Sequence, residues 1–134
     1  MKYKIELRYA DTDQMGLIYF ARHLIYADEA IGKFLKEIGI DILGLENSGI
    51  YMAVVHADID FKNPLRYGEN CEVEVEVGKV GNSSLTMKFS IFGNDVLKST
   101  GHVVYVFVDR NGRKLEVPVD IKEKLKALIT KNMT

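Results

Sequence analysis

Apolar residues follow two different periods along the chain. Between residues 18 and 38 they recur at every third or fourth position, which places them on one face of an α-helix. The positions are Phe20, Leu24, Ala27, Ile31, Phe34 and Ile38. The spacing therefore predicts one long amphipathic helix, ended by Gly39, because glycine readily adopts the left-handed conformation that follows many helices. Gly32 interrupts this helix at a cost of up to ~1 kcal/mol relative to alanine, so we expect a close backbone contact there.

From residue 51 onward the period changes to two, which indicates β-strands. The clearest alternation lies in residues 71–77, where a cysteine and three valines alternate with three glutamates. The apolar set is expected to face the core and the glutamates to form a solvated face. Strands are predicted at residues 3–9, 51–61, 71–77, 84–92 and 96–108. The short turns at Gly81–Ser84 and Gly93–Asp95 predict antiparallel hairpins.

The order of these elements predicts an α+β protein, with one long helix packed against an antiparallel sheet. Several predicted strands exceed the usual five or six residues, so the sheet is expected to curve around the helix. A short helical turn is expected at Asp41–Asn47. After Pro118, Asp120 is expected to N-cap a C-terminal helix, with Glu123 as its capping-box partner.

Composition narrows the class of protein. The 134 residues suit a single domain, which we place at residues 1–134. Eighteen basic and nineteen acidic residues leave a formal net charge of −1, so overall charge favours neither a nucleic-acid nor a membrane-surface partner. The single cysteine, Cys71, cannot form an internal disulfide, and the N-terminus lacks the apolar run of a signal peptide. The longest apolar run, Val103–Val108, is too short to span a bilayer. We therefore expect a cytoplasmic protein.

Two aspartates, Asp11 and Asp13, lie in the loop ahead of the long helix. Considered alone, such residues most often form turns or caps. A loop carboxylate can also attack a carbonyl carbon or activate water, while the free amides and positive end of the following helix stabilise an oxyanion. Residue types alone leave both interpretations open for Asp13, and we expect Asp11 to be structural.

The segment Tyr9–Gly39 resembles the YbgC / 4-hydroxybenzoyl-CoA thioesterase family, whose pattern is Y-x-D-T-D-x-x-G-x-V-Y followed by a long helix. The matching residues are Tyr9, Asp11, Thr12, Asp13, Gly16, Ile18 and Tyr19, with isoleucine in place of valine. A weaker similarity continues through "FKNPLRYGE", close to the family's P-x-R-x-x-D/E. The resemblance implies a hotdog fold, in which a curved antiparallel sheet wraps a long central helix. It further implies acyl-CoA thioesterase activity, a homodimer or homotetramer, and active sites at the subunit interface.

The resemblance also implies roles for individual residues. Asp13 occupies the position of the catalytic aspartate, as nucleophile or general base, and the amide of Phe20 occupies the position that polarises the thioester carbonyl. Several relatives carry a histidine where Phe20 stands, so a role for an imidazole at that position is absent here. Gly16 is expected to let the loop turn closely over the substrate, and Tyr19 to lie beside the pocket. His56 is expected to line the acyl pocket.

Binding of the coenzyme A phosphates needs local cations. Lys62 and Arg66 are the candidates after the second long strand, although each, taken singly, is more often a solubilising loop charge. The three histidines lack the spacing of a metal site, so we expect no metal and no cofactor. Cys71 is expected to pack in the core and not to act as a nucleophile.

Alternative functions stay open at this point. A hotdog hydratase or dehydratase uses a histidine together with a carboxylate, and a non-catalytic acyl-carrier or protein-binding module would keep the fold as a scaffold. The acyl group is also open, as is the choice between coenzyme A and an acyl-carrier protein. Short aliphatic, long aliphatic and aromatic acyl groups are all compatible with the sequence.

Overall fold

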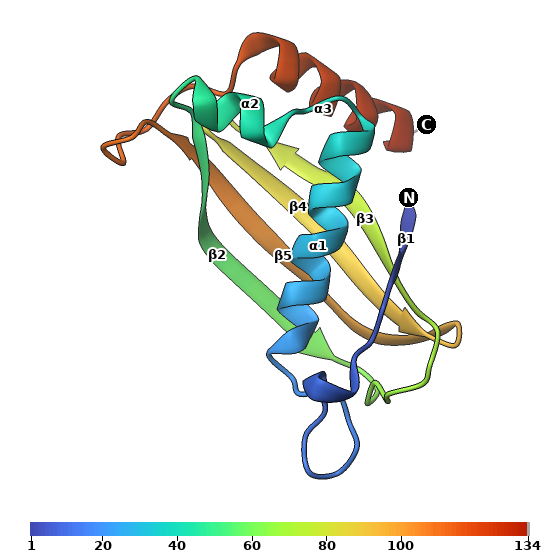
Figure 1. Cartoon of the computed structure of the whole chain (residues 1–134). Helices are drawn as coiled ribbons and strands as arrows, with labels where there is room; N and C mark the ends of the chain where they lie inside the picture. Colours follow the sequence, from blue (N-terminus) through green and yellow to red (C-terminus); the bar gives the residue numbers. More distant parts are fainter. Residues whose placement is uncertain (134) are drawn as a thin grey trace. The chain divides into compact units, whose positions relative to one another are not determined.

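The computed structural model describes residues 1–133 and contains one five-stranded antiparallel sheet with three α-helices in that part of the chain. The strand order in the sheet is β1-β3-β4-β5-β2 (Figure 1). The elements are β1 (Lys2–Ile5), the 3-10 helix η1 (Tyr9–Asp11), α1 (Arg22–Glu37), α2 (Ile42–Asn47), β2 (Tyr51–Phe61), β3 (Cys71–Val80), β4 (Ser84–Gly93), β5 (Val96–Val108) and α3 (Val119–Met133). The predicted α+β class is confirmed.

Helix α1 is the long amphipathic helix that the apolar spacing predicts, but it begins later than expected. Its first helical residue is Arg22, because Ile18 is held in an extended bridge with Thr12. Ala27, Ile31 and Phe34 are buried as predicted. The helix ends before Gly39, which has a φ of +87°, so the predicted glycine stop is confirmed.

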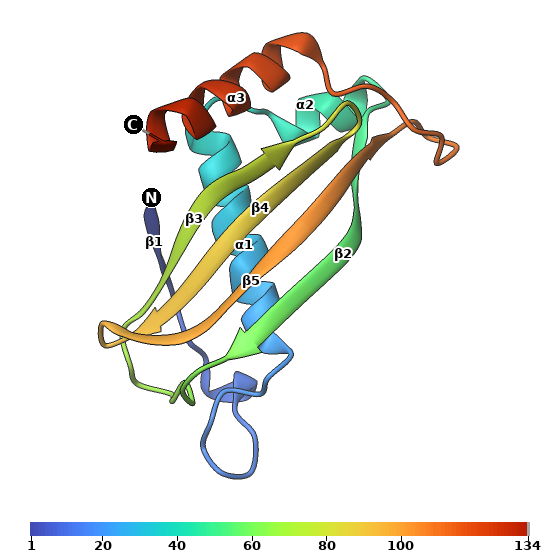
Figure 2. The same ribbon diagram turned by 180° about the vertical axis from the view of Figure 1, so that it is seen from behind.

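Contacts divide the chain into two compact units. The first comprises residues 1–34, 58–76 and 89–101, and the second comprises residues 35–57, 77–88 and the chain from 102 onward. Within the first unit, α1 lies along one face of the strands, as both views show (Figures 1 and 2). Residues from α1, β3 and β4 fill the core of this unit: Ala27, Ala30, Ile31, Val73, Val75, Phe89 and Ile91. This unit carries all the residues of the candidate site described below.

The second unit has its own buried core. Many of the buried side chains in it come from β4, β5 and α3, among them Leu85, Met87, Phe107, Ile121 and Leu125. The short helix predicted at Asp41–Asn47 is present as α2. None of the helices in residues 1–133 is long and apolar enough to cross a membrane.

Two local expectations are wrong. Asp120 does not cap α3, because the helix already begins at Val119 and the Lys122 amide donates to the Pro118 carbonyl at 2.9 Å. Asp120 lies inside the first turn, where a negative charge suits the positive end of the helix. A Cβ added at Gly32 would have no described atom within 4 Å, so the expected close backbone contact at Gly32 is absent within residues 1–133.

Strand β2 lies at an edge of the sheet and is exposed on both faces. Its apolar side chains do not alternate between core and solvent, and Val54, Val55 and Phe61 are 56%, 60% and 49% exposed. An edge strand presents unpaired backbone groups that can pair with another chain. By contrast, residues 71–77 alternate between core and solvent as the sequence predicts.

Candidate active site

The loop around Asp13 is built by the aspartate itself. Its Oδ1 atom accepts hydrogen bonds from the amides of Met15 at 2.8 Å and Leu17 at 3.2 Å, while the Asp13 amide donates to the Leu17 carbonyl at 2.7 Å. Gly16 has a φ of +76°, a conformation that glycine adopts without strain. The spacing D-x-x-G-L therefore forms a tight turn with hydrogen bonds inside the segment.

One oxygen of the Asp13 carboxylate stays available for chemistry. Both amides of the turn donate to Oδ1. Within residues 1–133, Oδ2 accepts no hydrogen bond. The Asp13 side chain is exposed, so this oxygen can meet a substrate or a water molecule. The turn thus fixes the orientation of the carboxylate through Oδ1 and leaves Oδ2 without a hydrogen-bond donor from the part of the chain that the structure describes.

Asp11 has a different role, as expected. It is buried, and its Oδ2 atom accepts a hydrogen bond from the Tyr26 hydroxyl at 2.7 Å. The Arg22 Nε atom lies 3.4 Å from the other oxygen. Burial, followed by the hydrogen bond and the charge of Asp11, raises the pKa of Tyr26 well above its usual value. Asp11 therefore ties the loop to α1, and both of its carboxylate oxygens have partners.

A cavity of about 400 Å³ lies beside the Asp13 loop. Its lining comes from the Asp13 loop, the start of α1 and the segment after β2: Asp13, Leu17, Ile18, Phe20, His23, Phe61, Lys62, Asn63, Pro64 and Leu65. Most of these side chains are apolar, with one carboxylate, one ammonium group, one imidazole and one carboxamide among them. A mainly apolar hollow with a few polar groups is the usual composition of a small-molecule site.

Phe20 lies just before α1 and not inside it, which corrects the expected position at the helix start. Its carbonyl accepts a hydrogen bond from the His23 amide at 3.2 Å, so the residue still belongs to the turn that opens the helix. Within residues 1–133, the Phe20 amide donates to no carbonyl. A free amide at the positive end of a 16-residue helix is a suitable donor to an oxyanion.

His23 is one of the cavity residues that sequence reasoning missed. Its side chain is only 3% exposed, its Nδ1 atom lies 2.9 Å from the Ser99 hydroxyl oxygen, and its ring meets Phe61 edge-on at a centroid distance of 5.0 Å. Burial lowers the pKa of His23 from 6.5 to about 4, so the imidazole is neutral at pH 7. A single histidine at this position has no sequence pattern that would have revealed its place in the cavity.

The remaining predicted site residues lie at different places. Lys62 lines the cavity, whereas Gly16, Tyr19 and Arg66 do not, although the Tyr19 ring lies 4.7 Å from that of Phe20. His56 lies on the part of β2 that belongs to the second unit and is also outside the lining. The binding roles of these residues therefore stay predictions.

Cys71 packs in the core, as the alternation predicts. It is 3% exposed, and burial raises the pKa of its thiol to about 12, so it is not a nucleophile at neutral pH. No group of three or more histidine, cysteine, aspartate or glutamate residues within the described chain is arranged to hold a metal ion.

The fold and the site together define an α+β protein of the hotdog type, with a turn-held carboxylate and a free amide at the opening of a long helix. The chain belongs to the Thioesterase-like superfamily, whose family model matches residues 7–125. It is therefore a thioester hydrolase.

Individual relatives agree with this assignment. A 1,4-dihydroxy-2-naphthoyl-CoA hydrolase of Crocosphaera subtropica is 32% identical over 98 residues, which are 72% of each chain. The crystal structure of protein TT1821 from Thermus thermophilus superposes with a TM-score of 0.88 at 28% identity, covering 95% of this chain and 98% of that one. The DHNA-CoA thioesterase of Staphylococcus aureus has a TM-score of 0.91 at 23% identity, covering 98% and 93%, and shares the fold.

Proposed function

We propose that this protein is an acyl-CoA thioesterase, which converts an acyl-CoA and water into a carboxylic acid and free coenzyme A. One observation carries the proposal: Asp13, with a free carboxylate oxygen, and Phe20, with a free amide, line the same cavity. The match to the Thioesterase-like superfamily and the similarity to a naphthoyl-CoA hydrolase support the choice of a CoA thioester as substrate.

The proposed reaction needs only these groups. Oδ2 of Asp13 either attacks the thioester carbon directly, giving an anhydride that water then hydrolyses, or takes a proton from the attacking water. In both routes the carbonyl oxygen gains negative charge, which the Phe20 amide and the helix N-terminus stabilise. The carbon–sulfur bond then breaks without a strong acid, because the conjugate acid of the leaving thiolate has a pKa of about 8.5.

Several finer assignments form part of this proposal. We assign the chain to the YbgC / 4-hydroxybenzoyl-CoA branch on the motif that includes Asp13 and Gly16, and we treat residues 1–134 as one thioesterase domain. Lys62 lines the cavity beside the carboxylate, which supports a role for it in holding a phosphate of coenzyme A. Arg66 is a second candidate, since its loop borders the Asp13 turn through the bridge to Leu17.

A panel of acyl-CoA thioesters tests the function. Purified protein, mixed with short aliphatic, long aliphatic and aromatic acyl-CoAs and a chromogenic thiol reagent, is expected to release thiol from at least one. The expected kcat/KM for the preferred ester is at least about 10⁴ M⁻¹s⁻¹, the lower end for enzymes. Acyl-carrier thioesters of the same acyl groups show which carrier is used. Release no faster than the uncatalysed rate for every ester would reject the proposal.

We also propose that a second copy of the chain pairs with β2. The exposed edge strand supports this, because Val54 and Val55 leave apolar surface uncovered on a long strand that pairs with β5 on one side only. With a chain mass of 15.2 kDa, light scattering after size exclusion is expected to give about 30 kDa for a dimer or about 61 kDa for a tetramer. Val55→Lys is expected to shift the mass toward 15.2 kDa, and Val119→Lys, 71% exposed on α3, serves as the control. A wild-type mass of 15.2 kDa would contradict pairing.

A further inference from the structure

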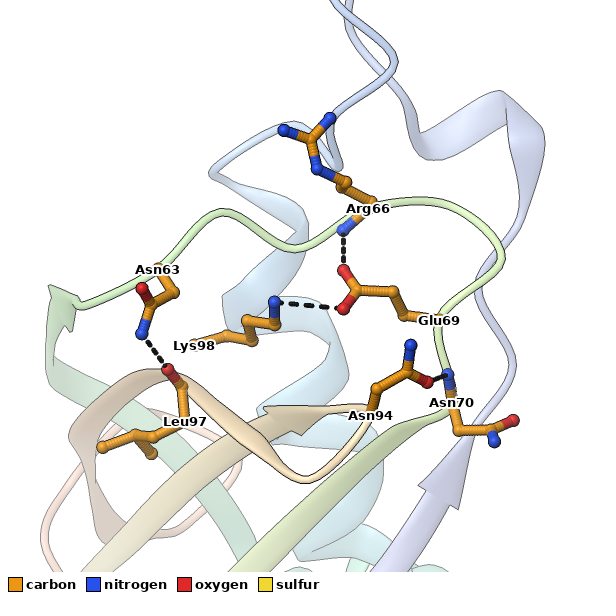
Figure 3. Close-up of polar contacts among 7 residues, drawn as sticks. All are labelled: Asn63, Arg66, Glu69, Asn70, Asn94, Leu97 and Lys98. Atoms are coloured by element: carbon orange, nitrogen blue, oxygen red, sulfur yellow. Dashed lines mark hydrogen bonds and ion pairs between the residues drawn. The ribbon is translucent and has the colours of Figure 1, made fainter.

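The first unit contains a largely buried ion pair outside the cavity. Nζ of Lys98, on β5, lies 3.0 Å from Oε2 of Glu69, and the two side chains are 9% and 15% exposed (Figure 3). Buried lysine and glutamate are rare in proteins unless they are paired, because each loses its hydration on burial. The second carboxylate oxygen of Glu69 accepts a hydrogen bond from the Arg66 amide at 2.6 Å.

The pair holds the segment from Lys62 to Asn70, which connects β2 to β3. One end of this segment is tied to β5, since the amides of Lys62 and Asn63 both donate to the Lys98 carbonyl, at 2.8 and 3.1 Å. The other end is tied to the β4–β5 turn, where the Asn70 amide donates to Oδ1 of Asn94 at 2.9 Å. The ion pair lies next to the Asn70 end, at Glu69, and Glu69 reaches the middle of the segment through the amide of Arg66, whose side chain points away from the pair (Figure 3).

This segment is directly bonded to the Asp13 loop. The Leu65 carbonyl accepts a hydrogen bond from the Ile18 amide at 2.8 Å, and Arg66 forms a bridge with Leu17. Leu17 in turn exchanges two hydrogen bonds with Asp13, at 2.7 and 3.2 Å. The path from Glu69 to the free carboxylate oxygen therefore runs through one backbone hydrogen bond, one bridge and the turn itself.

Gly93 shows that this region is closely packed. A Cβ at Gly93 would lie 2.8 Å from Leu65 Cδ1 and 2.8 Å from Lys98 Cε, and 3.2 Å from Glu69 Oε2. Gly93 is buried in β4, so its lack of a side chain makes room for the ion pair and for Leu65. Leu65, Glu69 and Lys98, which hold the segment in place, are therefore packed closely together around Gly93.

We propose that Lys98 and Glu69 are positioning residues, which hold the free oxygen of Asp13 in its productive place through Leu65, Arg66 and Leu17. The proposal rests on the function proposed above for Asp13. A shift of about 1 Å in a reacting group can lower a rate by about 10²-fold, so loss of the pair is expected to lower kcat by about 10- to 100-fold. KM is expected to change less than about threefold, because the cavity-lining residues at the β2 end keep their own bonds to β5.

Four variants test the proposal. Lys98→Met removes one charge, and Lys98→Arg keeps it as the conservative rescue. The double variant Lys98→Met with Glu69→Gln leaves no buried charge but keeps an oxygen for the Arg66 amide, so it separates the ion pair from the cost of burying an unpaired carboxylate. Lys33→Met is the matched control, because Lys33 pairs with Glu29 at 3.5 Å on the exposed face of α1.

Hydrogen–deuterium exchange gives a readout that does not depend on activity. In the double variant, the amides of residues 13–18 are expected to exchange at least about tenfold faster than in the wild type, while the amides of β4 keep their protection. Lys98→Arg is expected to restore both slow exchange and kcat, and Lys33→Met to change neither.

Two results would overturn the proposal. Unchanged exchange at residues 13–18 in the double variant would show that the ion pair does not hold the loop. Faster exchange with an unchanged kcat would show that the loop position does not matter for the reaction. If the wild type hydrolyses no thioester, the function proposed for Asp13 fails, while the exchange measurement still decides whether the pair holds the loop. If Lys98→Met alone does not fold, the double variant and Lys98→Arg still give both readouts.

Discussion

Replacing Asp13 with asparagine is expected to lower kcat/KM for the preferred acyl-CoA by about 10²- to 10⁴-fold, the range typical for loss of a catalytic acid–base group. Asparagine keeps a side-chain oxygen that can accept the hydrogen bonds from Met15 and Leu17, so the turn should be preserved. What disappears is the negative charge that attacks the carbonyl or takes a proton from water. Thiol release measured over a range of substrate concentrations checks the prediction.

The chain offers a matched control at Asp109. Its Oδ1 atom accepts hydrogen bonds from the amides of Asn111 at 2.8 Å and Arg113 at 3.0 Å, and Gly112 has a φ of +80°. This turn repeats the geometry of the Asp13 turn but lies in the second unit, outside the cavity. Asp109→Asn should therefore leave kcat/KM within about twofold of the wild type. Asp13→Asn with wild-type activity, in a protein with an unchanged circular dichroism spectrum, would remove Asp13 from the mechanism.

Acid is expected to destabilise the protein strongly through His23. Its pKa in the folded protein is about 4, against 6.5 for an ordinary histidine, because burial disfavours the charged ring. Above pH 6.5 the residue is neutral in both states and contributes no pH dependence. Between pH 6.5 and pH 4 the unfolded chain binds a proton that the folded protein does not, so the free energy of unfolding falls by about 3 kcal/mol in total.

Urea unfolding at a series of pH values measures this effect. Carboxylates titrate in the same range, so the comparison must be with a variant that lacks only the imidazole. His23→Asn is suitable, because asparagine is neutral throughout and retains a polar atom near the Ser99 hydroxyl. The variant should be less stable than the wild type at pH 7, and the difference should shift by about 3 kcal/mol in favour of the variant by pH 4. Parallel curves for the two proteins would show that His23 is not held neutral by burial.

Local patterns predicted most of the secondary structure. In β3 every second residue faces the core, and in α1 every third or fourth residue does. The order of apolar and polar residues in the sequence shows both periods directly. Errors arose where tertiary contacts decided the outcome. Ile18 fits the helical spacing, but its amide donates to the Leu65 carbonyl at 2.8 Å and the residue forms an extended bridge with Thr12, so α1 begins at Arg22.

The candidate site was predictable only in part, for a related reason. Asp13 builds its own turn from neighbouring residues, so its motif is visible in the sequence. His23 depends on Ser99 and Phe61, which are distant in the chain, and a lone histidine in a helix has no pattern that reveals such partners. The ion pair of Lys98 and Glu69 is hidden in the same way, since each residue alone resembles an ordinary surface charge.

The same type of turn occurs at Asp13 and at Asp109. The two aspartates have nearly identical backbone surroundings, and each is followed three residues later by a glycine with positive φ. On the function proposed for Asp13, the reactive carboxylate therefore requires no unusual local chemistry. A common turn of this kind, placed at the edge of an apolar cavity, would be enough to give a first hydrolase activity. Later substitutions would then need only to improve the position of the carboxylate.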